Sequence, residues 1–166
     1  MSFANKLLRW VVGALFFGHG TQKLFGWFGG NGLDATAQGF EALGLRPGRR
    51  NAIAAGAAEA GGGALLASGL ATPLAASALT ATMLTAIKTV HLKNGPWATD
   101  GGYEYNLVLI AAVLALAEMD SEQAGSRAAL AALALGAAGA LGAHLLAESD
   151  AGASEPEPAG AHRASE

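Results

Sequence analysis

The chain has 166 residues, a formal net charge of −3 and no cysteine. The lack of cysteine excludes disulfides, thiol catalysis and cysteine-ligated metal or iron–sulfur centres, and the weakly acidic balance offers no basic surface for nucleic acid. Hydrophobic residues make up 52% of the sequence and charged residues only 14%, against roughly a quarter charged in soluble domains. This composition predicts an all-α protein, a polytopic bundle of transmembrane helices.

The first hydrophobic segment, residues 7–28, is long enough to cross a bilayer, which needs roughly 20 residues. Lys6 and Arg9 precede its apolar part as in a signal peptide, but no small-residue cleavage site follows, so we expect an uncleaved span. A polar connection comes next, and residues 33–43 within it place their apolar side chains at helical spacing. We expect this stretch to form a short interfacial helix that covers one end of the bundle.

The next two hydrophobic segments, residues 51–70 and 74–92, are separated by Ala71-Thr72-Pro73 and should form a helical hairpin. Thr72 suits the capping position of the second helix, and Pro73 suits its first helical position. Glycines 61–63 lie inside the first of the two segments. In a membrane, such glycines allow a neighbouring backbone to approach closely.

A fourth helix is expected from about residue 103 to 118, followed by an acidic turn. Residues 128–147 are uncharged and rich in alanine and glycine, which predicts a fifth helix that packs closely through its glycines. The predicted organisation is therefore a four-helix membrane core over residues 1–118, then a turn and fifth helix over 119–147. Residues 148–166 have too little apolar content to fold, and we expect a disordered tail.

Because successive spans alternate in direction, the polar side chains inside them gather at one end of the bundle. These side chains are His19, Gln22, Lys23, Glu59, Lys88, His91 and Glu104. Glu59 should lie deeper than the others, given the rise of about 1.5 Å per helical residue. Ionisable groups in a membrane are costly and usually face other protein or a water-filled cavity. We therefore expect one connected polar site, with carboxylate and ammonium groups paired.

Several motifs follow one another along the chain in a recognisable order. They are Gly18-His19-Gly20-Thr21-Gln22-Lys23-Leu24-Phe25-Gly26, Glu59-Ala60-Gly61-Gly62, Leu70-Ala71-Thr72-Pro73, Val90-His91-Leu92-Lys93-Asn94-Gly95 and Asp100-Gly101-Gly102-Tyr103-Glu104-Tyr105. Together they resemble the successive signatures of the DoxX family over roughly residues 5–118. After the fourth helix, Glu118-Met119-Asp120-Ser121-Glu122 departs from the family pattern, so the fifth segment lies outside the resemblance.

The resemblance implies a multi-pass protein of the bacterial or archaeal inner membrane with a cytoplasmic N-terminus. The positive charges that flank the spans are nearly balanced and favour the opposite orientation only weakly. We therefore adopt the orientation that the resemblance implies.

DoxX relatives include the membrane subunit of a thiosulfate:quinone oxidoreductase, and others are associated with oxidative-stress or detoxification assemblies. The resemblance therefore implies, as a first hypothesis, a quinone-interacting subunit of a membrane oxidoreductase or oxidative-stress assembly. In this hypothesis His19, Lys23 and Glu59 form a catalytic polar cluster that anchors a quinone carbonyl or gives it protons. The candidate quinone or ligand pocket comprises His19, Gln22, Lys88, His91 and Glu104. A partner protein must supply the other redox centre, because the chain has no evident electron carrier of its own.

The second hypothesis is a non-catalytic membrane scaffold or small-solute pathway, in which the same cluster is structural. In this alternative each polar residue has a structural role. Lysine side chains reach the membrane interface, Glu59 neutralises a lysine, and Glu104 favours the positive end of a helix dipole. A homo-oligomer in the lipid bilayer is compatible with both hypotheses. Haem and metal ions are not expected, because the histidines on different spans come with no further ligand spacing. Co-purified quinone favours the first hypothesis, and a partner complex without quinone favours the second.

Overall fold

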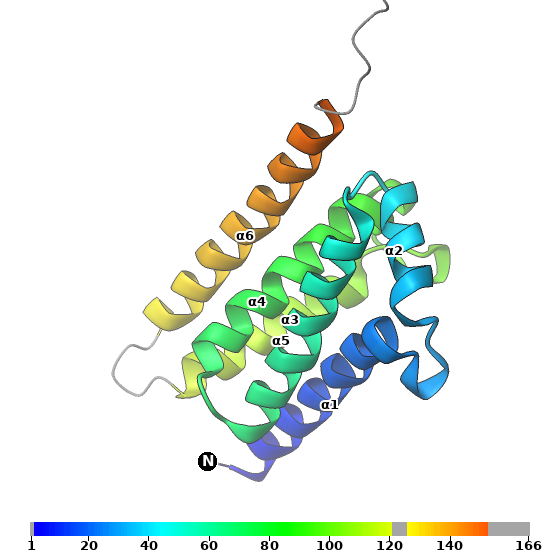
Figure 1. Ribbon diagram of the computed structural model, residues 1–166. Coiled ribbons are helices and arrows are strands. Elements are labelled where there is room, and N and C mark those ends of the chain that lie inside the picture. Colours follow the sequence, from blue (N-terminus) through cyan, green and yellow to red (C-terminus); the bar gives the residue numbers. More distant parts are fainter. Residues whose placement is uncertain (1, 121–125, 153–166) are drawn as a thin grey trace, which may run out of the picture.

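The structure is a computed structural model that describes residues 2–120 and 126–152. In these residues it contains helices and turns and no strand (Figure 1). The α-helices are α1 (Phe3–Phe25), α2 (Gly32–Ala42), α3 (Gly48–Ser68), α4 (Thr72–Ala86), α5 (Glu104–Asp120) and α6 (Ser126–Gly152). The predicted all-α bundle of four core helices with a fifth C-terminal helix is confirmed.

Helix α4 continues as a π-helical turn, η2 (Ile87–His91), and a 3₁₀ turn, η3 (Leu92–Asn94). In the described part of the chain, two helical stretches are long and apolar enough to cross a membrane: Thr72–Asn94 and Ala129–Leu146. Helix α5 has only 17 residues, and α1 carries several ionisable groups along its length. Five crossings therefore stay a prediction.

Helices α1, α3, α4 and α5 enclose the core, and α6 packs along the outside of α4 (Figure 1). The largest fully buried apolar side chains are Phe16, Leu66, Leu79, Leu116 and Val113. Helix α2 crosses one end of the bundle and contacts α3 and α1. The short helix expected over one end of the bundle is therefore present.

Helices α1 and α3 touch through their backbones at glycines. A Cβ atom added to Gly20 would lie 2.3 Å from the amide nitrogen of Ala60, and one added to Gly63 would lie 2.6 Å from the carbonyl oxygen of Gly13. Real Cβ atoms do not approach so closely, so only glycine fits at these two positions. By contrast, a Cβ at Gly61 would meet nothing within 4 Å.

A buried polar network ties four helices at the end of the bundle away from α2. The guanidinium of Arg9 on α1 lies 2.6 Å from Asp120 on α5, and it donates at 2.8 Å to the carbonyl oxygen of Leu66 on α3. It also donates at 3.2 Å to the hydroxyl of Thr72 on α4, which itself donates to Asp120. Arg9 is 3% exposed, so its charge depends on these partners.

Two local expectations need correction. Helix α4 begins at Thr72 and its capping residue is Ala71, in a left-handed conformation with φ 47°. The Thr72 hydroxyl bonds to Asp120 on α5 instead of capping its own helix. Helix α6 continues to Gly152, past the residue at which we expected the tail to start. The acidic turn at 121–125 and residues 153–166 lie outside the described residues.

Candidate functional site

A cavity of about 670 Å³ lies beside α3 and α4 near the end that α2 covers. Many small apolar residues line it. From α3 and α4 they are Ala54, Ala55, Ala58, Ala78, Ala81 and Ala86, and from α6 they are Gly139 and Ala143. Phe40, Leu43 and Leu45, in and after α2, line the cavity as well. Ligand pockets in proteins typically occupy roughly 300–1,000 Å³ and are mostly apolar with a few placed polar groups.

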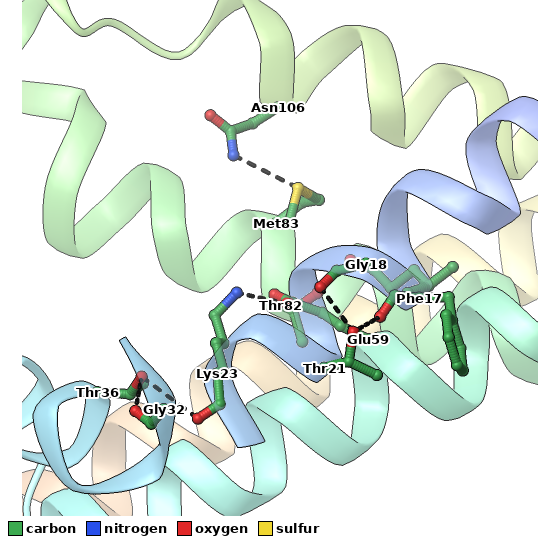
Figure 2. Close-up of polar contacts among 11 residues, drawn as sticks. Phe17, Gly18, Thr21, Lys23, Gly32, Thr36, Glu59, Thr82, Met83 and Asn106 are labelled. Carbon is green, nitrogen blue, oxygen red and sulfur yellow. Dashed lines mark hydrogen bonds and ion pairs between the residues drawn. The ribbon is translucent and has the colours of Figure 1, made fainter. Parts of the chain in front are cut away.

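The charged part of the wall is an ion pair between Lys23 on α1 and Glu59 on α3, whose side chains meet in Figure 2. The Glu59 side chain is only 5% exposed, whereas that of Lys23 is 27% exposed. Glu59 lies about 16 Å along α3 from Gly48, since a helix rises about 1.5 Å per residue. An uncompensated carboxylate at that depth would be costly, so the pair holds both charges in place.

His91 reaches the same cavity from the end of the π-helical turn η2. Its Nδ1 lies 2.7 Å from the carbonyl oxygen of Gly101, which also accepts a bond from Asn94 at 3.2 Å. Because a carbonyl oxygen only accepts, Nδ1 carries the proton, and Nε2 stays available as an acceptor or, in the imidazolium, as a donor. Single π-helical turns of this kind occur frequently at functional sites.

His19 lies one helical turn before Lys23 on α1 and also lines the cavity. The structure thus places four of the expected residues around one cavity, namely His19, Lys23, Glu59 and His91. They come from three helices that are distant in sequence. Lys23 and Glu59 form an ion pair, and one connected polar site that includes both histidines stays a prediction.

The other three expected residues have different surroundings. Gln22 donates at 3.2 Å to the carbonyl oxygen of Phe28, and Glu104 accepts at 2.7 Å from the amide of Ala98, so each holds a loop. Lys88 is exposed and lines a second cavity of about 210 Å³ between α4 and α6, together with His144. None of the three lines the larger cavity.

Two amides on the cavity wall, Asn51 on α3 and Asn106 on α5, were not expected from the sequence. Asn106 is 7% exposed, and its amide nitrogen lies 3.4 Å from the Met83 sulfur (Figure 2). The amide nitrogen of Asn51 is shielded from solvent and has no hydrogen-bond partner within residues 2–120 and 126–152. The available signal was an uncharged polar residue within an apolar segment.

Among the described residues, no group of three or more His, Asp or Glu side chains is placed to hold a metal ion. The cavity is lined by ionisable side chains and amides among apolar residues. Such an arrangement suits a largely apolar molecule with a few polar atoms.

Comparisons with known proteins identify the family of the chain. The DoxX family model matches residues 4–92. A Bacillus subtilis (strain 168) protein named "Putative oxidoreductase CatD" is 36% identical over 110 residues, which are 66% of this chain and 75% of that protein. No solved structure matches the chain. The chain belongs to the DoxX family of membrane proteins.

Proposed function

We propose that this protein binds a quinone in the cavity beside α3 and α4 and serves as a quinone-interacting subunit of a membrane oxidoreductase. The observation that carries the proposal is the Lys23–Glu59 ion pair on the wall of a largely apolar cavity of about 670 Å³. A quinone is a flat apolar ring with two carbonyl oxygens that become basic on reduction. The cavity supplies apolar surface for the ring and cations for the oxygens.

The name of the Bacillus subtilis relative, an oxidoreductase, supports a redox role. Reduction of one quinone to a quinol takes up two electrons and two protons. We assign the electrons to a partner protein with its own redox centre, because this chain contains no cysteine for an iron–sulfur cluster and no evident electron carrier.

The protons pass through the cavity wall. The Lys23 ammonium donates one proton to a quinone oxygen as negative charge develops there, and Glu59 holds the ammonium in position until then. The imidazolium of His91 donates the second proton from Nε2, while Gly101 fixes the ring through Nδ1. Both groups regain protons from water at the end covered by α2.

The proposal places the protein in the inner membrane as a multi-pass protein with a cytoplasmic N-terminus. Since α1 ends at the end covered by α2, the cavity then lies nearer the external face (Figure 1). A cysteine introduced at Asn94 will react with an impermeant thiol reagent in intact cells, whereas reaction only after lysis would reverse the orientation.

The proposed function predicts that filling the cavity prevents quinone binding. Ala58 lines the cavity next to Glu59, so a phenylalanine at this position will occupy part of the space for the ring. Decyl-plastoquinone should raise the melting temperature of the wild-type protein. We expect Ala58→Phe to lower the affinity for decyl-plastoquinone, as derived from this rise, at least tenfold. The measurement is the melting temperature in detergent against quinone concentration.

The neighbouring Ala57 is exposed and does not line the cavity, so Ala57→Phe is the matched control and should bind quinone as the wild type does. Equal binding by both variants would contradict the proposal. If the wild-type protein gains no stability from quinone, the scaffold or solute-pathway hypothesis would replace it.

A further inference from the structure

The two amides on the cavity wall have hydrogen-bonding capacity that the protein does not use well. The amide nitrogen of Asn51 is shielded from solvent and has no partner among the described residues. The amide nitrogen of Asn106 has the Met83 sulfur at 3.4 Å, and a thioether is a weak acceptor. Buried polar groups in folded proteins are normally hydrogen-bonded, so each exception calls for an explanation.

A structural explanation accounts poorly for this pair. Neither amide links its helix strongly to another helix, whereas the terminal guanidinium nitrogens of Arg9 bond to groups on three other helices. The Nε of Arg9 has no partner in the described part of the chain, but it does not line the cavity. Asn106 is 7% exposed, so it is largely withdrawn from water. Two amides line one cavity, one with an unpaired nitrogen and one paired only with a weak sulfur acceptor, and this indicates an occupant with acceptor atoms.

We propose that Asn51 and Asn106 are the residues that select the occupant, by donating to two acceptor oxygens on one ring. This inference rests on the proposed function and narrows it, because a dicarbonyl ring has two such oxygens and a hydrocarbon or a plain lipid tail has none. On binding, the oxygen near Asn106 replaces the sulfur of Met83 as the acceptor. The two amides are neutral, so they hold the oxygens without giving up protons, which remains the role of Lys23 and His91.

The class of ligand follows from this division of roles. The apolar wall accepts many flat molecules, but the unused donors recover hydrogen bonds only with a ligand that brings acceptors. A site built around hydrogen bonds rejects an analogue that lacks the bonding atoms, because its own donors then stay unpaired. The protein should therefore prefer a quinone over a hydrocarbon of the same shape.

The test compares two probes on the full-length protein in detergent. One probe is decyl-plastoquinone, and the other is 4-decyl-o-xylene, which carries the same ring substituents without the carbonyl oxygens. The affinity for each comes from the rise in melting temperature with probe concentration. The wild-type protein should bind the quinone at least tenfold more tightly than the hydrocarbon.

Replacement of either amide by leucine keeps its approximate shape and removes its donors. Asn51→Leu and Asn106→Leu should each lower the preference for the quinone roughly tenfold, the weight of one neutral hydrogen bond. Their affinity for the hydrocarbon should be unchanged or higher. The ratio of the two affinities separates recognition of the carbonyl oxygens from a general loss of structure, because a loss of structure would weaken the binding of both probes.

Two matched variants serve as controls. Asn5→Leu removes a buried amide on α1 that does not line the cavity, and it should leave the preference unchanged. Met83→Leu removes the competing sulfur and should keep or increase the affinity for the quinone. If Met83→Leu lowered the affinity for the quinone as much as Asn106→Leu does, loss of the contact between Asn106 and Met83 would explain both results. That outcome would overturn the inference.

The outcomes separate this inference from the proposed function. Quinone binding with an unchanged preference in both asparagine variants would overturn the selection by Asn51 and Asn106 and leave the quinone function in place. Equal affinity of the wild-type protein for the quinone and the hydrocarbon would also overturn the selection by Asn51 and Asn106 and leave the quinone function in place. Absence of quinone binding by the wild type would overturn both.

Discussion

Replacement of Gly20 by leucine will separate α1 from α3 and destabilise the protein by about 3 kcal/mol or more. The reason is that a Cβ atom at this position would lie 2.3 Å from the amide nitrogen of Ala60, which is backbone and cannot turn aside as a side chain does. Relief of this overlap requires α1 to move away, and Lys23 on the next turn moves with it. The melting temperature in detergent measures the loss.

Gly18 offers the matched control for this change, because it lies on the same helix and a Cβ there would meet nothing within 4 Å. Gly18→Leu should leave the melting temperature unchanged or raise it, since leucine favours a helix more than glycine does. Similar melting temperatures for the two variants would contradict the close contact between α1 and α3.

Replacement of Arg9 by methionine will have a comparable effect at the other end of the bundle. The change leaves the Asp120 carboxylate, whose side chain is 14% exposed, without its cation, and also removes the donor to the Leu66 carbonyl. Breaking a buried ion pair by removal of one partner typically costs about 3–5 kcal/mol. The loss should be visible in thermal unfolding in detergent.

Lys6 on the same helix is exposed, so Lys6→Met removes an equal charge and should change stability by less than about 0.5 kcal/mol. The double variant Arg9→Met with Asp120→Asn should recover part of the loss, because no unpaired charge remains. Strict additivity of the two single changes would show that Arg9 and Asp120 do not act as a pair.

The sequence predicted the helices well because long apolar runs alternate with stretches of glycine, proline and charged residues. The depth of Glu59 and Lys23 also followed from the rise of a helix, and this explains why their side chains were expected near each other. The pairing of Lys23 with Glu59 depended on the close approach of α1 and α3. The glycines at positions 61–63 predicted that another helix packs closely against α3, but not which one. Of these three glycines only Gly63 meets α1, at Gly13 and Phe17. Gly20 packs against Gly56 and Ala60 instead, and its role was not apparent from the sequence.

Lys88 shows where simple helical spacing failed. Two residues three apart share a face in an α-helix, and on this ground Lys88 and His91 were expected together. The chain instead forms the π-helical turn η2 over Ile87–His91, and its larger number of residues per turn rotates the two positions apart. His91 therefore lines the larger cavity, whereas Lys88 lines the smaller one beside α6.

Arg9 and Asp120 were treated as charges flanking the spans, because neither residue has a local signal of burial. They are 111 positions apart in the sequence, and only the arrangement of four helices brings them together. Asn51 and Asn106 were missed for a related reason. An isolated asparagine in a helical segment gives no spacing pattern, so its place on a cavity wall depends on tertiary structure.

The central claim is that the cavity beside α3 and α4 holds a quinone, and the quinone content of the protein tests it most directly. The protein would be purified from its native membrane in mild detergent, and bound lipids and quinones would be quantified by mass spectrometry. Our account predicts about one quinone per chain in the wild type and a large loss from Ala58→Phe but not from Ala57→Phe. Phospholipid without quinone in the wild type, or equal quinone in all three proteins, would contradict it.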